Sequence, residues 1–459
     1  MKELHDIQEV YFIGIGGIGM SALARYFNAK GKKVSGYDKT ETDLTRQLVK
    51  EGITVYYEDD EKHIAKAADL VVYTPAIPKE HKGLLYYRQN GYTLLKRSDV
   101  LGAITKSSFN ICIAGTHGKT TITTMTAHLL RHSGYGCNAF LGGIAANYNS
   151  NFWSSEKNVC VVEADEYDRS FLKLRPDIAV ISAMDADHLD IYGTEEEMQQ
   201  AFVDFAGQVK KGGTLFSKWG LKRSADLKAD HHFTYSLQHS NASTYAANIT
   251  NREGGYAFDV YTTGGWLKAV ALNMGGLHNI ENAVAAIAIA KQLHIEDEKI
   301  KAAIADFKGV KRRFEYIIPP SGNSQTVYVD DYAHHPAELE ALIKSAKRLF
   351  ADKKCTVVFQ PHLFSRTRDF AEAFAASLDL ADEVILLPVY PARELPIAGV
   401  TSKMIFDKMK NKNKRIMSKE EALHWIKNGY GQNTPNLLIT AGAGDIDQLV
   451  RPVKEILER

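Results

Sequence analysis

The sequence has little cysteine and almost no surplus charge, and both facts narrow the kinds of protein it can encode. Its four cysteines are widely spaced and form no C-x-x-C pair, which excludes a zinc or disulfide framework. The formal net charge is only +1, which argues against a general nucleic-acid or membrane-surface binder. We therefore expect no nucleic-acid partner.

Long apolar runs are also missing. The N-terminal segment MKELHDIQEV lacks the apolar core of a signal peptide. No uncharged segment approaches the roughly 18 residues that a transmembrane helix needs. The sequence therefore predicts a cytoplasmic protein without membrane insertion.

The length of 459 residues suits about three domains of ordinary globular composition, with 45% apolar and 24% charged residues. Strands alternate with helices over most of the chain, which predicts an α/β fold. We expect a Rossmann-like N-terminal domain at 1–107 and a second Rossmann-like domain at 317–459. Between them, 108–316 is expected to hold a P-loop-type ATPase sheet with a small antiparallel β patch from His232 to Gly275.

The central domain opens with a phosphate-binding pattern. An apolar run, Ile111 to Ala114, predicts a buried strand, and a helix follows the loop Gly115-Thr116-His117-Gly118-Lys119-Thr120-Thr121. In such a loop, backbone N–H groups and the helix N-terminus attract phosphate, the lysine adds a full charge, and a threonine hydroxyl can bind Mg²⁺. The strict pattern is not met, because Ile113 stands where its first glycine would fall. A glycine-rich turn with an exposed lysine is the alternative.

Polar side chains follow the next two predicted strands. Asn158 to Val162 ends in the acidic segment Glu163-Ala164-Asp165-Glu166-Tyr167-Asp168, and Asp177 to Ser182 ends near Asp187-His188. An acid delivered by a buried strand beside a phosphate loop is the arrangement that holds Mg²⁺. A solvated acidic loop and a structural histidine are the plainer alternatives.

The N-terminal segment carries a second glycine loop. A strand at Val10–Ile15 runs into Gly14-Ile15-Gly16-Gly17-Ile18-Gly19, and Asp38 ends the following strand. This G-x-G-x-x-G pattern with a later acid is the dinucleotide-binding fingerprint, which suggests NAD or FAD. The same loop suits any nucleotide diphosphate, and a ligand-free turn is a further alternative.

Further polar clusters follow the central domain. Asn279 and Asn282 lie one turn apart at the start of an alanine-rich helix, where they suit either helix capping or contact with an adenine edge. The basic triplet Lys311-Arg312-Arg313 is either solvated or a phosphate contact. The segment Asp330-Asp331-Tyr332-Ala333-His334-His335 follows a strand of the last domain, and a transition-metal site there is the less favoured interpretation.

The chemistry suggested by these parts is ATP-driven ligation. Two nucleotide-type loops are present, no G-x-S-x-G motif stands out, and no cysteine has a histidine close in sequence. A carboxylate is a poor electrophile, so its oxygen would first attack the γ-phosphate of ATP, and an amine would then displace phosphate. Such catalysis rests on positioning and on neutralising phosphoryl charge.

At this point the sequence resembles the Mur ligases of peptidoglycan synthesis. The segments that carry the resemblance run in the family's order from Tyr11 to Asp445 and are FIGIGGIGMS, AGTHGKTT, VEADEYDRSFL, MDADHLDIYG, LHNIENA, FKGVKRRFE, DDYAHHPAE and FQPHLFSRTR. DDYAHHP and FQPH…SRTR resemble the branch that couples L-alanine to UDP-N-acetylmuramate. The resemblance implies ATP with two Mg²⁺ ions as cofactors, UDP rather than NAD at the first loop, and a monomer or homodimer.

The resemblance also assigns roles by position. It implies catalytic roles for Lys119, Glu163, His188, Arg312 and Asp331, and Mg²⁺ binding by Thr120, Glu163 and His188. The ATP-binding residues that it implies are Gly115, Thr116, His117, Gly118, Lys119, Thr120, Thr121, His278, Asn279, Asn282, Arg312 and Asp331. Those implied for the UDP-substrate are Gly14, Gly16, Gly17, Gly19, Met20, Ser21, Asp38, Thr74, His188, His334 and Arg366. Whether Arg312 or Arg313 meets the γ-phosphate stays open.

Three departures from the family pattern stand out. Ala183 replaces a frequent asparagine, and Leu363 replaces the first arginine of the HRYTR form. No lysine occurs from His188 to Val209, so we expect no carbamylated lysine of the kind that several relatives use. Selectivity for L-alanine over glycine or L-serine rests on the resemblance alone.

Three rival functions remain at this stage. They are an NAD-dependent oxidoreductase, supported only by the first glycine loop, a recycling ligase that adds a ready-made peptide to the same sugar nucleotide, and a non-catalytic nucleotide-binding regulator.

Overall fold

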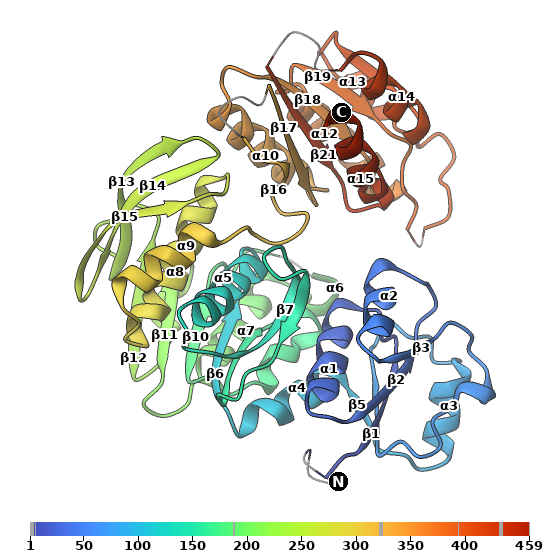
Figure 1. The fold of residues 1–459 in the computed structure, drawn as a ribbon, viewed down its shortest axis with the longest axis vertical. Coiled ribbons are helices and arrows are strands. Elements are labelled where there is room, and N and C mark those ends of the chain that lie inside the picture. The colour runs from blue at the N-terminus through green and yellow to red at the C-terminus, as the bar shows by residue number, and fades with distance from the viewer. Residues whose placement is uncertain are drawn as a thin grey trace. The chain divides into compact units, whose positions relative to one another are not determined.

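The computed structural model describes residues 4, 6–186, 189–320, 325–392, 394–430 and 435–458, and it confirms an α/β fold of three domains (Figure 1). By its internal packing, the chain divides into two compact units. The first comprises Met1–Ala247, Val260–Leu267 and Glu281–Ile304, and the second comprises Asn248–Asp259, Lys268–Ile280 and Ala305–Arg459. The domain boundaries expected near residues 107 and 316 stay predictions.

The first sheet is parallel and has the strand order β3-β2-β1-β4-β5. Its strands are β1 Glu9–Ile13, β2 Lys33–Tyr37, β3 Thr54–Tyr56, β4 Leu70–Tyr73 and β5 Leu94–Lys96. The helices of this region are α1 Ile18–Ala29, α2 Asp43–Lys50, α3 Lys82–Gln89 and α4 Arg97–Lys106, with a 3₁₀ turn at Glu61–His63. The strand order reverses between β1 and β4, so the loop after β1 lies where ligands bind in open α/β sheets.

The central sheet has the order β15-β14-β13-β12-β11-β10-β6-β9-β7-β8. Its strands are β6 Phe109–Ala114, β7 Asn138–Ala145, β8 Ser150–Trp153, β9 Val159–Glu163, β10 Ile178–Ile181, β11 Thr214–Lys218, β12 His231–Ser236, β13 Thr244–Arg252, β14 Gly255–Thr262 and β15 Gly265–Leu272. Its helices are α5 Lys119–His132, α6 Leu189–Tyr192, α7 Glu195–Ala206, α8 Leu277–Gln292 and α9 Asp297–Asp306, with 3₁₀ turns at Tyr167–Lys173 and Ser224–Asp226. Because β6 pairs in parallel with both β9 and β10, the loops that follow these strands meet at one edge.

The expected antiparallel patch differs from the prediction in its first strand. β12 pairs in parallel with both β11 and β13, so it extends the central sheet instead of starting a separate patch. Two-residue connections join β13 to β14 and β14 to β15, which is the geometry of antiparallel hairpins. The turn signals identified the hairpins, but strand direction at β12 depends on a pairing partner that the local pattern does not reveal.

The third sheet has the order β16-β17-β21-β18-β19-β20, with only β16 antiparallel. Its strands are β16 Glu315–Ile318, β17 Thr326–Asp331, β18 Lys354–Phe359, β19 Glu383–Leu386, β20 Lys414–Ile416 and β21 Asn436–Ala441. Its helices are α10 Pro336–Leu349, α11 Phe364–Asp369, α12 Ala371–Leu378, α13 Lys403–Lys408, α14 Lys419–Gly429 and α15 Val450–Leu457, with a 3₁₀ turn at Asp445–Leu449. The sequence pattern here predicts one helix from Thr367 to Leu380, whereas the structure has two helices that meet at Phe370.

All four cysteines are buried. Cys112, Cys137, Cys160 and Cys355 are each at most 3% exposed, and none forms a disulfide. Burial raises the pKa of Cys137 and of Cys355 to about 12. These thiols are free core side chains, so none of them belongs to a disulfide framework.

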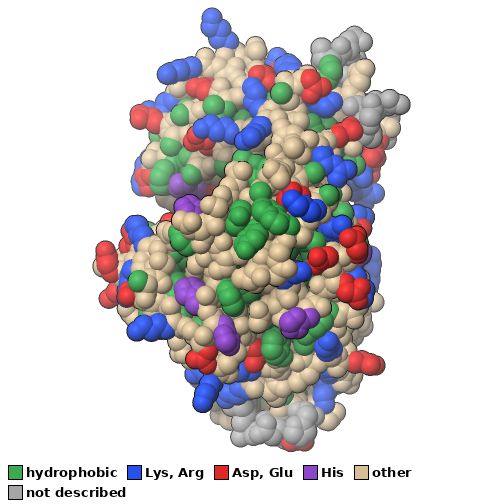
Figure 2. All heavy atoms as spheres, turned by 90° about the vertical axis from the view of Figure 1, so that its left-hand side faces the viewer, with side chains coloured by type: hydrophobic (Ala, Val, Ile, Leu, Met, Phe, Trp, Pro, Cys, Tyr) green, Lys and Arg blue, Asp and Glu red, His purple; other side chains and the backbone are tan. Residues whose placement is uncertain are grey.

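The surface carries charges of both signs. Figure 2 shows lysine and arginine side chains interspersed with aspartate and glutamate over the face that it presents, in keeping with the net charge of +1. In the described part of the chain, no helix combines the length and apolar character needed to cross a bilayer.

Candidate active site

The phosphate loop connects β6 to α5 and rests directly on the end of β10. Gly115 has φ +135°, and a Cβ placed there would lie 2.2 Å from Ser182 Oγ. The Ser182 hydroxyl donates to the carbonyl oxygens of Ala114 and His117. Only glycine combines this backbone conformation with so close a neighbour, so the loop is held flat against the strand.

The lysine of this loop is paired with a buried acid. Lys119 Nζ donates to Gly115 O and to Glu166 Oε1, both at 2.6 Å. The Glu166 side chain is 1% exposed, and that of Lys119 is 15% exposed. Burial raises the pKa of Glu166, and the charge of Lys119 opposes that rise. The sequence did not single out Glu166 within its acidic segment, because an acid three residues after Glu163 has no distinctive pattern.

Thr120 and Glu163, both expected to bind Mg²⁺, lie together. Thr120 Oγ1 donates to Glu163 Oε1 at 3.0 Å, and Glu163 Oε2 accepts the Gly142 N–H at 2.9 Å. Mg²⁺ binds oxygen at about 2.1 Å in octahedral geometry, so adjacent ligands lie about 3 Å apart. A hydroxyl and a carboxylate oxygen at this spacing fit the ion. His188, the third expected ligand, lies outside the described residues.

The remaining loop residues differ in exposure. Thr116 is bonded to the end of β10 on both sides, since its N–H donates to Ala183 O and its hydroxyl accepts the Asp185 N–H, each at 3.2 Å. His117 is 70% exposed and lies 3.6 Å from Asp185, whereas Thr121 is buried in α5. Ala183, which replaces an asparagine of the family pattern, thus contributes its backbone carbonyl to this contact.

Two of the three residues expected near adenine, His278 and Asn279, contact the residues just before their own helix. Asn279 donates through Nδ2 to Gly275 O at 2.6 Å, and the His278 ring packs against Gly276. Asn282 lies over the phosphate loop, where its Oδ1 would be 2.9 Å from a Cβ at Gly118. Asn282 therefore reaches the loop directly, while the Asn279 amide is engaged by the helix N-terminus.

The N-terminal glycine loop is braced by Asp38. The carboxylate of Asp38, at the end of β2, accepts the Gly16 N–H at 2.7 Å, and the N–H of Gly17 donates to Gly14 O at 3.2 Å. Thr74, after β4, packs against Gly14. The structure thus gathers these predicted residues at one strand edge. Asp38 holds the loop's own backbone, a role that the fingerprint does not reveal.

Two residues predicted at this loop have buried side chains. Met20 is 2% and Ser21 0% exposed. Ser21 Oγ donates to Ile18 O and accepts from Asn151 Nδ2, both at 2.9 Å. Both side chains therefore lie on the buried face of α1.

Arg97, at the start of α4, is a residue that sequence reasoning missed. Its guanidinium packs against Gly19, where a Cβ would lie 2.8 Å from Nη1, and its Nη2 donates to Asp165 at 3.2 Å. It therefore joins the N-terminal glycine loop to the acidic segment after β9. A lone arginine after a short strand gave no signal of this.

In the second unit, Arg312 is tied to two strand ends. It donates to Gly442 O and lies 3.5 Å from Asp330, and its guanidinium is stacked on the Tyr332 ring. Burial raises the pKa of Asp330 to about 7, against the lowering effects of Arg312 and Thr440. Arg312 has φ +60°, so its backbone is held in an uncommon conformation.

Asp331 holds the segment that carries Arg312. Its carboxylate accepts the N–H groups of Phe314 and Ala333, each at 2.7 Å, and the Tyr332 N–H donates to Arg312 O at 2.7 Å. Burial raises the pKa of Asp331 to about 6. These hydrogen bonds of the Asp331 carboxylate position the residues next to it.

His334 and Arg366 lie in one neighbourhood. The His334 ring is 6.1 Å from that of His362, and the nearby charge of Arg366 adds to the burial that lowers the pKa of His334. Leu363, which replaces an arginine of the family pattern, has φ +69° and donates its N–H to Tyr390 O. The leucine thus occupies a constrained backbone position before α11.

The transition-metal interpretation of Asp330–His335 gains no support. Among the described residues, the His, Cys, Asp and Glu side chains that converge closely enough for a metal are Glu58, Asp60 and His63, near the N-terminal sheet. Among the described residues, aspartate and histidine of the expected segment form no such group with each other.

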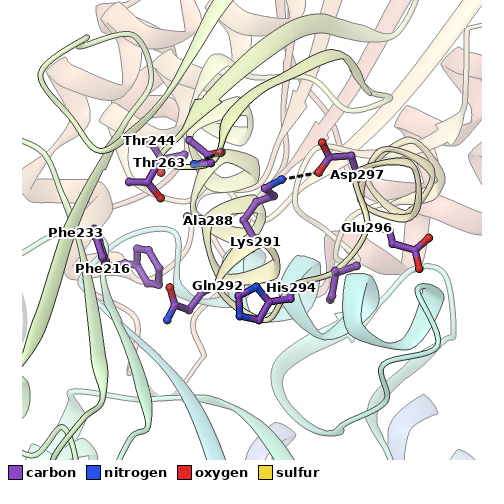
Figure 3. A pocket seen from close by; sticks show the side chains of 13 residues that line it. Phe216, Phe233, Thr244, Thr263, Ala288, Lys291, Gln292, His294, Glu296 and Asp297 are labelled. Atoms are coloured by element: carbon purple, nitrogen blue, oxygen red, sulfur yellow. Dashed lines mark hydrogen bonds and ion pairs between the residues drawn. The ribbon is translucent and has the colours of Figure 1, made fainter.

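A cavity of about 510 Å³ lies at the far end of α8 from Asn282 (Figure 3). Phe216, Gln292 and His294 face it, and Lys291 is paired with Asp297 at 2.6 Å. None of the predicted site residues lines it, so it is separate from the phosphate loop.

Comparison with known protein families gives one answer along the chain. Residues 9–109 match the model described as Mur ligase family, catalytic domain, and residues 113–290 match Mur ligase middle domain. Residues 312–444 match Mur ligase, glutamate ligase domain.

Individual relatives agree. The chain is 48% identical to a UDP-N-acetylmuramate–L-alanine ligase of Porphyromonas gingivalis, over 98% of this chain and 99% of the relative. A crystal structure of a UDP-N-acetylmuramate-alanine ligase from Thermotoga maritima has a TM-score of 0.83 at 28% identity, covering 98% of this chain and 99% of that one. A murein peptide ligase from Psychrobacter arcticus, with a TM-score of 0.67 at 23% identity and 98% of both chains covered, shares the fold.

Proposed function

The chain belongs to the Mur ligase family, and from that membership we propose how its residues carry out the reaction. The enzyme is an ATP-dependent ligase that joins L-alanine to the carboxylate of UDP-N-acetylmuramate. The products are UDP-N-acetylmuramoyl-L-alanine, ADP and phosphate, and the reaction serves peptidoglycan synthesis.

The reaction has two covalent steps. An oxygen of the substrate carboxylate attacks the γ-phosphorus of ATP, the bond to the β-phosphate oxygen breaks, and ADP leaves. The amine of L-alanine then attacks the acyl carbon, the carbon–oxygen bond to phosphate breaks, and the nitrogen loses a proton. Both steps need the reactants held in line and the phosphoryl charge neutralised.

We assign the phosphate end to the loop after β6. Lys119 contacts the β- and γ-phosphates, and the backbone of Gly115–Gly118 holds their oxygens at the N-terminus of α5. Thr120 and Glu163 hold Mg²⁺, and His188 holds a second ion. When bound, Mg²⁺ neutralises charge on the phosphate oxygens. Support comes from the Thr120–Glu163 contact of 3.0 Å at the edge where β6, β9 and β10 end.

We assign the sugar nucleotide to the loop after β1. The backbone of Gly14–Gly19 at the N-terminus of α1 suits a diphosphate, and Asp38 keeps the loop in shape. In the second unit, Arg312 serves the γ-phosphate and Asp331 fixes its position, while His334 and Arg366 contact the substrate. The Asp331 contacts to Phe314 and Ala333 support that division of roles.

We also propose that the enzyme works in the cytoplasm, as a monomer or homodimer, with domain boundaries after residues 107 and 316. Light scattering on the purified protein decides the oligomeric state, and limited proteolysis locates the boundaries.

The deciding experiment is phosphate release by the purified protein with one component omitted at a time from ATP, Mg²⁺, UDP-N-acetylmuramate and L-alanine. We expect release only from the complete mixture, with a product heavier by one alanyl residue. Release that ignores L-alanine but needs a tripeptide would support the recycling ligase. Nucleotide binding without release under any condition would support a regulator. Glycine and L-serine in place of L-alanine measure selectivity, and one methyl group contributes only about 1–3 kcal/mol in such a pocket.

A further inference from the structure

Glu166 is a buried acid that none of the roles above uses. It lies three residues after Glu163, and its side chain is 1% exposed. Its Oε1 accepts from Lys119 Nζ at 2.6 Å, while its Oε2 is buried without a hydrogen-bond partner among the described residues. A buried carboxylate oxygen without a donor is costly, and such groups persist in native proteins where function retains them.

The backbone of Glu166 is fixed from two sides. Its carbonyl oxygen accepts the Tyr192 hydroxyl at 2.6 Å and the Arg169 N–H at 2.9 Å. The Tyr192 ring is itself 1% exposed. Glu166 is therefore a rigid partner, whereas a lysine side chain is a flexible four-carbon stem.

The pairing limits what Lys119 can do when nucleotide arrives. Withdrawing Lys119 from Glu166 would leave a buried carboxylate unpaired, which is strongly unfavourable. The ammonium has three N–H donors, and Gly115 O and Glu166 Oε1 take two of them. One N–H therefore remains for a phosphate oxygen while both contacts are kept.

We infer that Glu166 is a positioning residue for the ligase reaction, which holds the Lys119 ammonium in one orientation so that its remaining N–H meets the transferring phosphoryl group. This inference rests on the proposed role of Lys119. Because the Lys119–Glu166 pair is close to neutral, Glu166 serves to orient the ammonium and does not strengthen the attraction for phosphate. Its loss should therefore lower kcat more than it weakens ATP binding.

The test compares Glu166→Ala, which removes the acceptor, with Glu166→Gln, which keeps an acceptor oxygen without the charge. We expect Glu166→Ala to lower kcat at least about tenfold, with the Kd for ATP changed by less than about threefold. Glu166→Gln should keep kcat within about threefold of the parent chain. Glu156→Ala, which removes an exposed glutamate of the same unit, is the matched control, and thermal unfolding checks that each variant folds.

A Lys119→Met background separates positioning from a general structural role. There, adding Glu166→Ala should change neither the residual rate nor the Kd for ATP, because the side chain that Glu166 orients is gone. If Glu166→Ala does not fold, Glu166→Met, which removes the acceptor and keeps the side-chain length, replaces it in both backgrounds. A further loss in that background would overturn the inference, as would full kcat in Glu166→Ala, equal losses in both Glu166 variants, or an ATP-affinity loss that matches the loss in kcat. A parent chain without L-alanine-dependent phosphate release would contradict the proposed function instead.

Discussion

The two glycine loops of the first unit share a backbone plan and differ in charge. Each connects a buried strand to a helix, β1 to α1 and β6 to α5. The first is braced by the Asp38 carboxylate and contains no lysine, whereas the second lies on Ser182 and carries Lys119. The common geometry creates an anion site, and the surrounding side chains decide which phosphate occupies it and whether chemistry follows.

This difference explains why the first loop left its ligand open. Backbone N–H groups at a helix terminus can bind NAD, FAD or UDP equally well, since all three present a diphosphate. The second loop is more informative because Lys119 adds a positive charge beside it. Thr120 and Glu163 add two oxygen atoms of the kind that bind Mg²⁺. Three changes test the contrast, from the largest expected effect to the smallest, and a fourth tests a strand end of the second unit.

Lys119→Ala should abolish most of the chemistry. We expect kcat to fall at least about 100-fold, because the loop loses its full positive charge beside the transferring phosphoryl group. Steady-state phosphate release measures the loss. Lys33→Ala, which removes a lysine 73% exposed on β2, is the control and should stay near the parent rate. Full activity in Lys119→Ala would return the non-catalytic regulator to consideration.

One added methyl group should distinguish the loops. Gly115→Ala places a Cβ 2.2 Å from Ser182 Oγ at φ +135°, so we expect the Kd for ATP to rise at least about tenfold. Gly17→Ala places its Cβ no closer than 3.5 Å to the nearest atom, and its φ of −62° suits any residue. We expect the Kd for ATP, measured by isothermal titration, to be the same in Gly17→Ala as in the parent chain. Comparable effects of the two substitutions would contradict the contrast.

Removing the brace of the first loop should affect one substrate only. Asp38→Ala deletes the acceptor of the Gly16 N–H, and a hydrogen bond to a charged group contributes about 1.5–3 kcal/mol. We expect the KM for UDP-N-acetylmuramate to rise about tenfold and the KM for ATP to stay within about twofold. An equal rise in both would mean that the loops do not bind separate substrates.

The strand end at Asp330 supplies a pH test outside the two loops. Burial raises its pKa from the ordinary 3.8 to about 7, so the folded state binds a proton more tightly than the unfolded state between these values. Its contribution to stability is therefore present below about pH 4 and is lost as pH rises to about 7. In calorimetry, the drop in the unfolding midpoint from pH 5 to pH 8 should be a few degrees smaller in Asp330→Asn. An unchanged drop would show that Asp330 ionises normally.

Much of the fold followed from local pattern. Apolar β-branched runs placed β6, β9 and β10 within two residues of their observed bounds. The parallel direction of β12 and the break at Phe370 could not be predicted, because strand pairing and helix packing depend on residues distant in sequence.

The candidate site likewise contains residues that could be predicted from the sequence and residues that could not. Residues inside a motif, such as Lys119 and Thr120, follow from spacing and glycine content. Partners from elsewhere do not: Arg97 meets Gly19 across 78 positions of sequence, and Glu166 was one acid among several. The roles implied for His278, His334 and Arg366 came only from family resemblance and stay predictions, as does the phosphate contact of Arg312.

The four buried thiols make the chain a convenient starting point for spectroscopy. With every native cysteine at most 3% exposed and raised in pKa, maleimide dyes and spin labels should ignore them in the folded protein. A single new cysteine can then be placed on the surface of each unit without first deleting the originals. Energy transfer between two such labels would follow the separation of the units as ATP and the sugar nucleotide are added.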